Sequence, residues 1–445
     1  MATVPENEVV AESDERTKPP FLRRVRIRGY KSIAFCDVAL QPLTVLVGRN
    51  ASGKSNFIDA LAFLRDVMES GVSDAVKRRD GWSSIHCRTA ESPSICFEIE
   101  AGFTCGQSSQ RMTGDASIAG KLFTARYDLE LADDVGTAPP IIVKESLDVF
   151  DETGGLGAGF EVQGGNVWKW KSEPDTIQPL NHPSSLLGLI RPDYPLLSAI
   201  GAQPFLDVAN GLRWMGCYNF HPDTIRRLQK PNPGRLLERD GSNLASVIET
   251  TRENEEEAIE RVGRYLSVIT ESVELAEVAK YGEYETVRFR IARDARSQPL
   301  EFDAASMSDG TLRTLAALVA AFQIVLPHGY PSLVAIEEPE TSLHPAAMRA
   351  LVDALDEATG RTQILLTTHS AELLDNPQVR PENVRVVDMI DGQTVITPVD
   401  EASVEIVRRK LNTLGGLERE NQLEPDLDDL ERQQRLGQSR QESPS

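Results

Sequence analysis

A chain of 445 residues is long enough to form a large hydrophobic core and two lobes. Its formal net charge of −21 disfavours non-specific binding of nucleic acid over most of the surface, but it does not exclude a local basic groove. Its five cysteines include no C-x-x-C pair, and its longest apolar run, 315–322, is far too short to span a bilayer, so we expect a cytoplasmic protein with reduced thiols and no membrane contact.

The chain opens with polar and acidic residues that end in two prolines. Residues 1–20 are therefore expected to form a disordered leader, and they lack the apolar stretch of a signal peptide. Residues 21–29 then alternate apolar and basic side chains, which predicts a strand with one face in water. Residues 38–40 are expected to pair with this strand as a hairpin.

A glycine-rich loop follows, between a short apolar strand, 43–47, and a helix, 56–64. The loop fits the phosphate-loop pattern of Gly, four residues and Gly-Lys-Ser, with Gly48, Arg49, Asn50, Ala51, Ser52, Gly53, Lys54 and Ser55, followed by Asn56. Its glycines let backbone N–H groups turn toward anionic oxygens, and the helix N-terminus adds partial positive charge. Lys54 is expected to reach the outer phosphates, and the Ser55 hydroxyl to bind Mg²⁺. A chance glycine-rich turn is the alternative, but the flanking strand and helix favour nucleotide binding.

The middle of the chain changes character after this helix. Four short strands separated by glycine turns are predicted, at 95–101, 123–131, 141–149 and 160–162, and they indicate an antiparallel β-subdomain. A stretch of mixed charge at 244–277 is expected to be helical, but it is too short and too weakly heptad-like for a long coiled coil.

The final third predicts a parallel βαβ unit, with buried strands at 333–336 and 363–367 joined through a helix at 345–358. The first strand ends in three carboxylates, Glu337, Glu338 and Glu340, and the second ends in Thr-Thr-His-Ser at 367–370. Ligands bind at the carboxyl ends of strands in such sheets. One carboxylate can hold Mg²⁺ and another can orient a water, whereas a solvated acidic turn is the alternative. His369 is then placed to contact a γ-phosphate, although a lone histidine is more often structural.

The segment 306–311, Ser-Met-Ser-Asp-Gly-Thr, precedes an apolar helix at 312–326. Ser308, Gly310 and the helix N-terminus offer a second anion site. An ordinary helix cap explains the same residues, and spacing alone favours the cap.

Taken together, these segments resemble the ABC-type ATPase heads of the RecF/SMC/OLD group, including stand-alone AAA-like ATPases that lack a TOPRIM domain. The shared segments are Gly-Tyr-Lys-Ser at 29–32, GRNASGKSN at 48–56, SMSDGTLR at 306–313, LVAIEEPETSLHP at 333–345 and TTHS at 367–370, in the family's order. The resemblance spans about 21–375 and is loose between 71 and 302.

The resemblance implies a mechanism in which two heads enclose two ATP molecules, so that Ser308 and Gly310 contact a γ-phosphate bound by the partner. It implies that Glu337 stands in the position of the usual Mg²⁺-associated Asp. Glu338 is then the general base and His369 the γ-phosphate sensor. The implied cofactors are ATP and Mg²⁺.

Three departures limit the resemblance. The glutamine that many members place near the metal has no clear counterpart, since Gln107 and Gln110 lie in a loop-like stretch. No long coiled coil is expected, which argues against chromosome tethering. No second acidic cluster of the TOPRIM type follows Ser370, so the chain is not expected to cut DNA itself.

Three functions remain open. The leading hypothesis is an ATP-hydrolysing switch that forms a homodimer on ATP and drives a protein effector, such as a nuclease, in DNA repair or antiviral defence. The alternatives are a RecF-type repair protein that binds DNA, and a nucleotide-dependent scaffold with negligible turnover.

The predicted fold class is α/β, a P-loop NTPase of the ABC-ATPase type with an antiparallel β-subdomain and a helical insertion. The predicted organisation is a leader at 1–20, the first part of the ATPase head at 21–220, a mainly helical insertion at 221–300, the second part of the head at 301–417 and a disordered acidic tail at 418–445.

Overall fold

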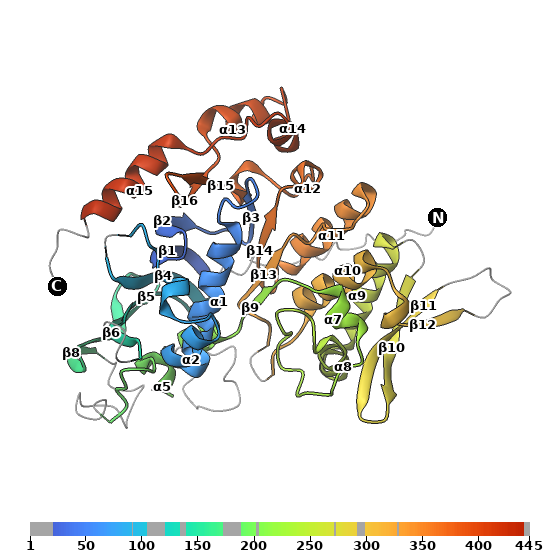
Figure 1. Cartoon of the computed structure of the whole chain (residues 1–445), viewed down its shortest axis with the longest axis horizontal. Coiled ribbons are helices and arrows are strands. Elements are labelled where there is room, and N and C mark those ends of the chain that lie inside the picture. Colours follow the sequence, from blue (N-terminus) through green and yellow to red (C-terminus); the bar gives the residue numbers. More distant parts are fainter. Residues whose placement is uncertain are drawn as a thin grey trace, which may run out of the picture.

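The computed structural model describes nine stretches of the chain, which are 21–90, 92–104, 121–133, 139–171, 188–201, 204–270, 273–291, 299–326 and 329–439. The expected leader and the two candidate glutamines, Gln107 and Gln110, lie outside these residues. Figure 1 shows two sheets with the helix α1 (Lys54–Ser70) running between them, and a helical layer to one side.

The central sheet has six strands in the order β16-β15-β3-β14-β13-β9. Its strands are β3 (Leu43–Val47), β9 (Met215–Tyr218), β13 (Leu333–Glu337), β14 (Gln363–Thr368), β15 (Val384–Ile390) and β16 (Gln393–Pro398). The five strands from β15 to β9 are parallel, and β16 closes one edge as an antiparallel partner of β15. Every residue of β3, β13 and β14 is buried, which is why these strands read as continuous apolar runs in the sequence.

Alternate residues of the central strands enter two different cores because side chains alternate across a strand. Leu46 of β3 and Ala335 of β13 pack with α1 and the second sheet. Val45 of β3 and Val334 of β13 pack on the other face, against α10 (Asp309–Phe322) and α11 (Pro345–Ala358). The central sheet is therefore covered on both faces.

The second sheet has seven strands, all antiparallel, in the order β2-β1-β4-β5-β6-β7-β8. Its strands are β1 (Leu22–Tyr30), β2 (Ile33–Ala39), β4 (Ser94–Thr104), β5 (Leu122–Ala132), β6 (Ile141–Phe150), β7 (Leu156–Gln163) and β8 (Asn166–Lys171). It contains the predicted hairpin of β1 and β2 and the strands of the predicted β-subdomain.

The remaining elements are mainly helical. The helices are α2 (Val72–Lys77), α3 (Trp82–Ile85), α5 (Leu196–Ala199), α6 (Phe205–Arg213), α7 (Pro222–Arg226), α8 (Leu244–Asn254), α9 (Glu256–Ile269), α12 (Ala371–Leu374), α13 (Glu401–Arg408), α14 (Leu414–Arg419) and α15 (Leu427–Ser439). A three-stranded sheet, β10 (Val273–Tyr281), β11 (Tyr284–Ile291) and β12 (Leu300–Asp303), projects beside α8 and α9 (Figure 1). Among the described residues, none of the helices has the length and apolar character needed to cross a bilayer.

The structure corrects the prediction of helix over 244–277. The helical part ends with α9, and Val273 begins strand β10, which pairs with β11 through a turn at Gly282. The physical reason is the alternation of β11, whose inward side chains such as Phe289 join the core that also contains α8 and α9.

The prediction of a disordered tail from residue 418 is also wrong over the described residues. Helix α15 docks on β2 and β16 (Figure 1). Gln433 is buried, donates to the carbonyl of Ile396 at 2.8 Å and accepts from the backbone N–H of Asp37 at 2.9 Å, while Arg432 pairs with the Asp37 carboxylate at 2.9 Å. The segment is held by specific hydrogen bonds rather than by an apolar face, so its polar composition suggested disorder.

Candidate nucleotide-binding site

The phosphate loop lies between the end of β3 and the start of α1, as predicted. Gly53 caps α1 with a φ of 105°, a conformation that favours glycine. A Cβ on Gly53 would lie 1.9 Å from the Thr394 hydroxyl, and one on Gly48 would lie 2.0 Å from the carbonyl oxygen of Val387. Both glycines are therefore required by the close approach of the β15–β16 hairpin.

Lys54 lies across this loop. Its ammonium donates to the carbonyls of Gly48 at 2.7 Å and Arg49 at 3.0 Å. Burial lowers the pKa of Lys54, and the nearby carboxylates of Glu338 and Glu418 act in the opposite direction. The lysine is thus held inside the loop, and the acidic strand end is close enough to act on it.

The other loop residues divide into exposed and buried ones. The side chains open to a ligand belong to Arg49, Asn50, Ala51 and Ser55. Ser52 is buried, and its hydroxyl has no hydrogen-bond partner among the described residues. The loop can therefore still donate from this hydroxyl to an anion.

Asn56 supports the loop from outside. Its amide donates to the Ser32 hydroxyl at 2.6 Å, which lies 2.6 Å from the Thr394 hydroxyl. Thr394 in turn donates to the carbonyl of Ser52 at 3.0 Å. Nucleotide contact by Asn56 stays a prediction, whereas its contact with the turn at Ser32 gives a structural role to the Gly-Tyr-Lys-Ser segment.

The acidic strand end lies beside the end of the neighbouring strand β14. Glu338 has a φ of 45°, and its backbone N–H donates to the carbonyl and hydroxyl of Thr367 at 3.1 and 3.2 Å. Its carboxylate lies 3.5 Å from Nδ1 of His369, and both side chains are partly exposed. The two residues predicted to be catalytic therefore face each other at the mouth of the site.

Glu337 differs from its neighbour because it is buried. Its carboxylate accepts from Arg239 at 3.2 Å, and the same guanidinium donates to Asp59 on α1 at 3.3 Å. Asp59 also accepts from Lys31 at 2.6 Å and from Tyr30 at 2.7 Å. This network connects the acidic strand to the helix that follows the phosphate loop. No sequence motif includes Arg239, so the sequence did not predict the network.

Glu340 is the third carboxylate of the strand end, and it faces inward. It accepts from the Thr368 hydroxyl at 2.5 Å, and its other oxygen is buried without a partner among the described residues. Burial raises the pKa of Glu340 above its usual range. The side chain thus braces the ends of β13 and β14 and has little access to water.

The donor set suits Mg²⁺. A hydroxyl on Ser55 and a carboxylate on Glu337 are oxygen ligands, and Mg²⁺ in nucleotide sites takes its remaining ligands from phosphates and water. Within the described part of the chain, no group of three or more His, Cys, Asp or Glu side chains forms a cage for a metal ion. The residues therefore fit an ion that arrives with the nucleotide.

Ser308 and Gly310 begin helix α10. The Ser308 hydroxyl accepts from the N–H of Thr311 at 3.2 Å, so the predicted cap is present. A Cβ on Gly310 would lie 2.5 Å from the carbonyl oxygen of Ser342, in the loop after the acidic strand. These contacts explain both residues within one chain, and their contact with a partner's nucleotide stays a prediction.

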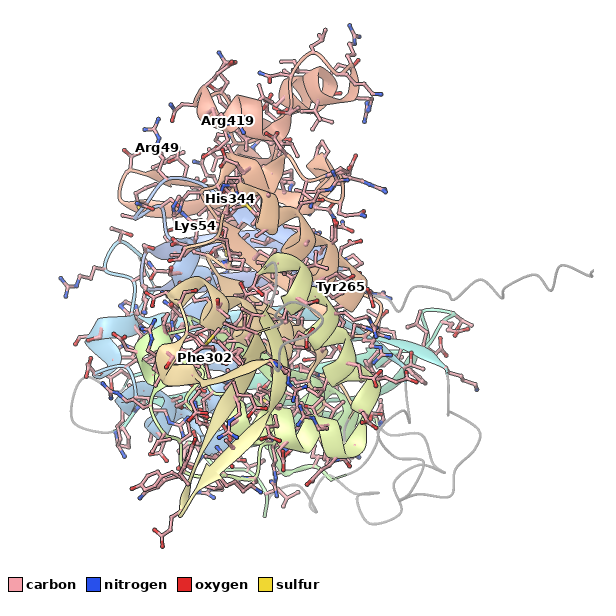
Figure 2. The ribbon with its side chains drawn as sticks, turned by 90° about the vertical axis from the view of Figure 1, so that its right-hand side faces the viewer. Arg49, Lys54, Tyr265, Phe302, His344 and Arg419 are labelled. Carbon is pink, nitrogen blue, oxygen red and sulfur yellow. The ribbon has the colours of Figure 1, made fainter. Side chains whose placement is uncertain are left out.

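Helix α14, in the C-terminal segment, lies close to the phosphate loop. Figure 2 places Arg49 and Lys54 of the loop at the same end of the molecule as Arg419 of α14. Burial raises the pKa of Glu418 on α14, whereas the nearby Lys54, Arg49 and His369 lower it. Glu418 is therefore an acidic neighbour of the phosphate loop, and no sequence pattern connects it to the motifs.

The chain is similar to known proteins over the segments that contain these motifs. The family model described as "AAA domain, putative AbiEii toxin, Type IV TA system" matches residues 43–94 and 213–375, which include every predicted site residue. The Old nuclease of Escherichia phage P2 is 24% identical over 383 residues, covering 79% of this chain. The chain spans 57% of the length of that protein.

Solved structures give distant matches. A structure of the SMC head bound to the C-winged helix domain of ScpA is 14% identical, with a TM-score of 0.45, and the match covers 86% of this chain and 99% of that one. The SMC head domain from Thermotoga maritima is 13% identical, with a TM-score of 0.39, and the match covers 85% and 99%.

Proposed function

Because the chain is an ABC-type ATPase head of the RecF/SMC/OLD group with the predicted α/β fold, we propose that it binds and hydrolyses ATP with Mg²⁺ and uses the cycle as a switch. One observation carries this proposal. Three adjacent parallel strands, β3, β14 and β13, end at the same edge of the sheet and bring Lys54, His369 and Glu338 together.

Each side chain has a role that fits its environment. Lys54 neutralises the outer phosphates from within the loop, and Ser55 and Glu337 hold the metal. Mg²⁺, when bound, would neutralise phosphate charge and orient the γ-phosphate. Glu338 is open to water and accepts a proton from the attacking water molecule. His369 lies beside Glu338 and donates a hydrogen bond to the γ-phosphate.

Phosphate release from ATP, measured with Mg²⁺ and with excess EDTA, tests this function directly. We expect turnover only with Mg²⁺. Equal turnover by the Lys54→Ala variant would show that a contaminant hydrolyses ATP and would overturn the proposal.

The proposed switch closes as a head-to-head homodimer, in which Ser308 and Gly310 of one chain complete the site of the other. The support is that Ser308 and Gly310 start a helix whose N-terminus can donate to an anion, although their hydrogen bonds within the chain only cap it. Ser308→Arg should block closure because a large cation fills that space. Mixing it with Lys54→Ala should restore part of the ATPase activity, since one composite site is then built only from intact motifs.

Light scattering across a dilution series in ATP provides the independent measurement. We expect a dimer whose specific ATPase activity rises with protein concentration. A monomer throughout, with activity independent of concentration, would show that one chain hydrolyses ATP unaided.

The proposed output is action on a protein effector, such as a nuclease, in DNA repair or antiviral defence. It is supported by the likeness to the Old nuclease, of which this chain spans 57%, and by a family description that names a toxin system. A pull-down with Glu338→Gln in ATP, against Lys54→Ala as control, should retain this effector. ATPase activity that depends on added DNA would instead favour the DNA-binding function, and binding without turnover would favour a scaffold.

A further inference from the structure

A pocket lies between α1 and the loop that precedes α8. Its volume is about 450 Å³, within the range of small-molecule pockets. We name it the arginine pocket. Its lining is rich in guanidinium groups and consists of Arg65, Glu69, Arg78, Arg213, Trp214, Asn232, Pro233, Gly234, Arg235, Leu236, Leu237, Glu238 and Asn243.

The positive charge of the arginine pocket is only partly compensated. The carboxylate of Asp66 is shared by three guanidinium groups, those of Arg65 at 2.8 Å, Arg79 at 2.8 Å and Arg78 at 3.7 Å. Among the described residues, no carboxylate lies within ion-pair distance of Arg235. In a chain with a net charge of −21, such a concentration of arginine requires an explanation.

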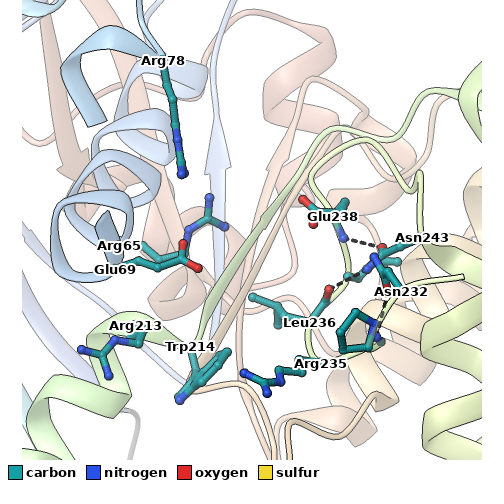
Figure 3. Close-up of a pocket in the computed structure, with 13 residues that line it drawn as sticks. Arg65, Glu69, Arg78, Arg213, Trp214, Asn232, Arg235, Leu236, Glu238 and Asn243 are labelled. Atoms are coloured by element: carbon teal, nitrogen blue, oxygen red, sulfur yellow. Dashed lines mark hydrogen bonds between the residues drawn. The ribbon is translucent and has the colours of Figure 1, made fainter. Parts of the chain in front are cut away.

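The arrangement of the arginines suggests where an anion would bind. In Figure 3, Arg78 extends down toward Arg65 on one side of the pocket, and Arg235 reaches across from the opposite loop toward Trp214. One guanidinium group can donate two parallel hydrogen bonds to the oxygens of a phosphate, which suits arginine to phosphate binding better than other side chains.

The other lining residues suit the rest of a nucleotide. Glu69 and Glu238 line the same pocket and make no ion pair among the described residues, so they can accept hydrogen bonds from sugar hydroxyls. The indole of Trp214 offers an aromatic surface for a base. A long nucleic acid would bring many phosphates close to these two carboxylates, which favours a small ligand.

We propose that the arginine pocket binds a nucleoside phosphate, at a site separate from the ATP bound by the phosphate loop. The phosphate contacts Arg78 and Arg235, and the nucleoside lies toward Trp214 and the carboxylates. The proposal goes beyond ATP hydrolysis and does not depend on it, because the pocket is lined by the second half of α1, the residue after α2, the end of α6 and the loop before α8, and none of the lining residues is a predicted nucleotide-site residue.

Calorimetry with the Lys54→Ala variant isolates the arginine pocket from the phosphate loop. AMP, GMP, CMP and UMP are titrated separately, with the four nucleosides as controls. We expect at least one monophosphate to bind with a Kd below about 1 mM and its nucleoside to bind much more weakly. Adding Arg235→Ala should weaken this binding roughly tenfold to a hundredfold, the usual effect of losing a hydrogen bond to a charged group.

Arg227→Ala is the matched control, because Arg227 is also exposed, precedes the same loop and does not line the pocket. It should leave binding unchanged. Arg78→Ala provides a second pocket variant if Arg235→Ala alters the thermal melting curve. Absence of binding by all four monophosphates up to 5 mM, or binding that neither pocket variant weakens, would overturn the proposal. Tighter, Arg235-dependent binding of a 5′-phosphorylated single-stranded oligonucleotide would also overturn it, because the occupant would then be nucleic acid.

Discussion

Replacing Glu338 with Gln is expected to slow ATP turnover by about 10²–10⁴-fold while leaving ATP binding intact, the usual effect of removing a general base. Because each factor of ten corresponds to about 1.4 kcal/mol, the loss is roughly 3–5 kcal/mol of transition-state stabilisation. The substitution keeps the size of the side chain. It also keeps the two hydrogen bonds from the backbone N–H of residue 338 to Thr367, so the strand end should not move.

The structure supports the proposal that Glu338, rather than either of its acidic neighbours, is the base. Glu337 is buried and accepts from Arg239, so its carboxylate has less access to water than that of Glu338. Glu340 is buried against Thr368, and burial raises its pKa, which leaves it a poor partner for water. The Glu338 carboxylate is 40% exposed and lies 3.5 Å from His369. Of the three carboxylates, it alone combines access to water with a position beside His369, the proposed γ-phosphate sensor.

The assay measures phosphate release at saturating ATP and, separately, ATP affinity by calorimetry. Glu431→Gln is the matched control, because Glu431 is an exposed glutamate on α15 that pairs with Arg435 on the same helix. It should hydrolyse ATP at the rate of the unsubstituted protein. Normal turnover by Glu338→Gln together with slow turnover by Glu337→Gln would show that the two carboxylates exchange roles.

Three further predictions follow from the same contacts. Lys54→Ala should abolish ATP binding because the ammonium inside the loop is lost, and unchanged affinity in calorimetry would contradict the phosphate-loop assignment. Asp59→Asn should lower the free energy of unfolding at pH 7 by about 3 kcal/mol in urea titrations, because it breaks a buried ion-pair network. Burial raises the pKa of Asp59, but Arg79 and Lys31 outweigh burial and hold that pKa below its usual value. The stabilisation should therefore be present above about pH 4 and should be lost as the pH falls further. Identical acid dependence of the stability of the two proteins would refute this prediction. Glu418→Gln should tighten ATP binding about two- to fivefold, the range for a partly solvated charge interaction, and weaker binding would show that Glu418 helps to hold Lys54 in place.

Much of the site could be predicted because its parts lie in strands that are buried on both faces. A strand between two covered faces is mainly apolar, so β3, β13 and β14 stand out from the surrounding polar sequence. Glu338 and His369 follow β13 and β14 directly, and the loop that contains Lys54 follows β3, so the residues proposed to carry the chemistry lie close to the strand ends. The parallel βαβ unit predicted β13 and β14, whereas the place of β3 beside β14 is known only from the structure.

The supporting residues could not be predicted in the same way. Arg239 joins Glu337 to Asp59 across 98 and 180 residues of chain, respectively, and no local pattern marks such a contact. The same holds for Thr394, whose hydroxyl holds the phosphate loop from 342 residues away. Composition was misleading for α15, because a segment that binds through Gln433 and Arg432 has the same polar character as one that does not fold.

The position of β14 between β3 and β13 has a consequence for how the site can change state. Thr367 at the end of β14 accepts from the backbone of Glu338, and the next residue, Thr368, donates to Glu340, so the acidic strand end is oriented by its neighbour. His369 follows in the same chain segment. A γ-phosphate that pulls on His369 therefore pulls on the residues that hold Glu338 at its positive φ. Under the roles proposed for His369 and Glu338, sensing the nucleotide and orienting the base would be performed by one short strand end, which would link hydrolysis to the presence of a correctly bound γ-phosphate.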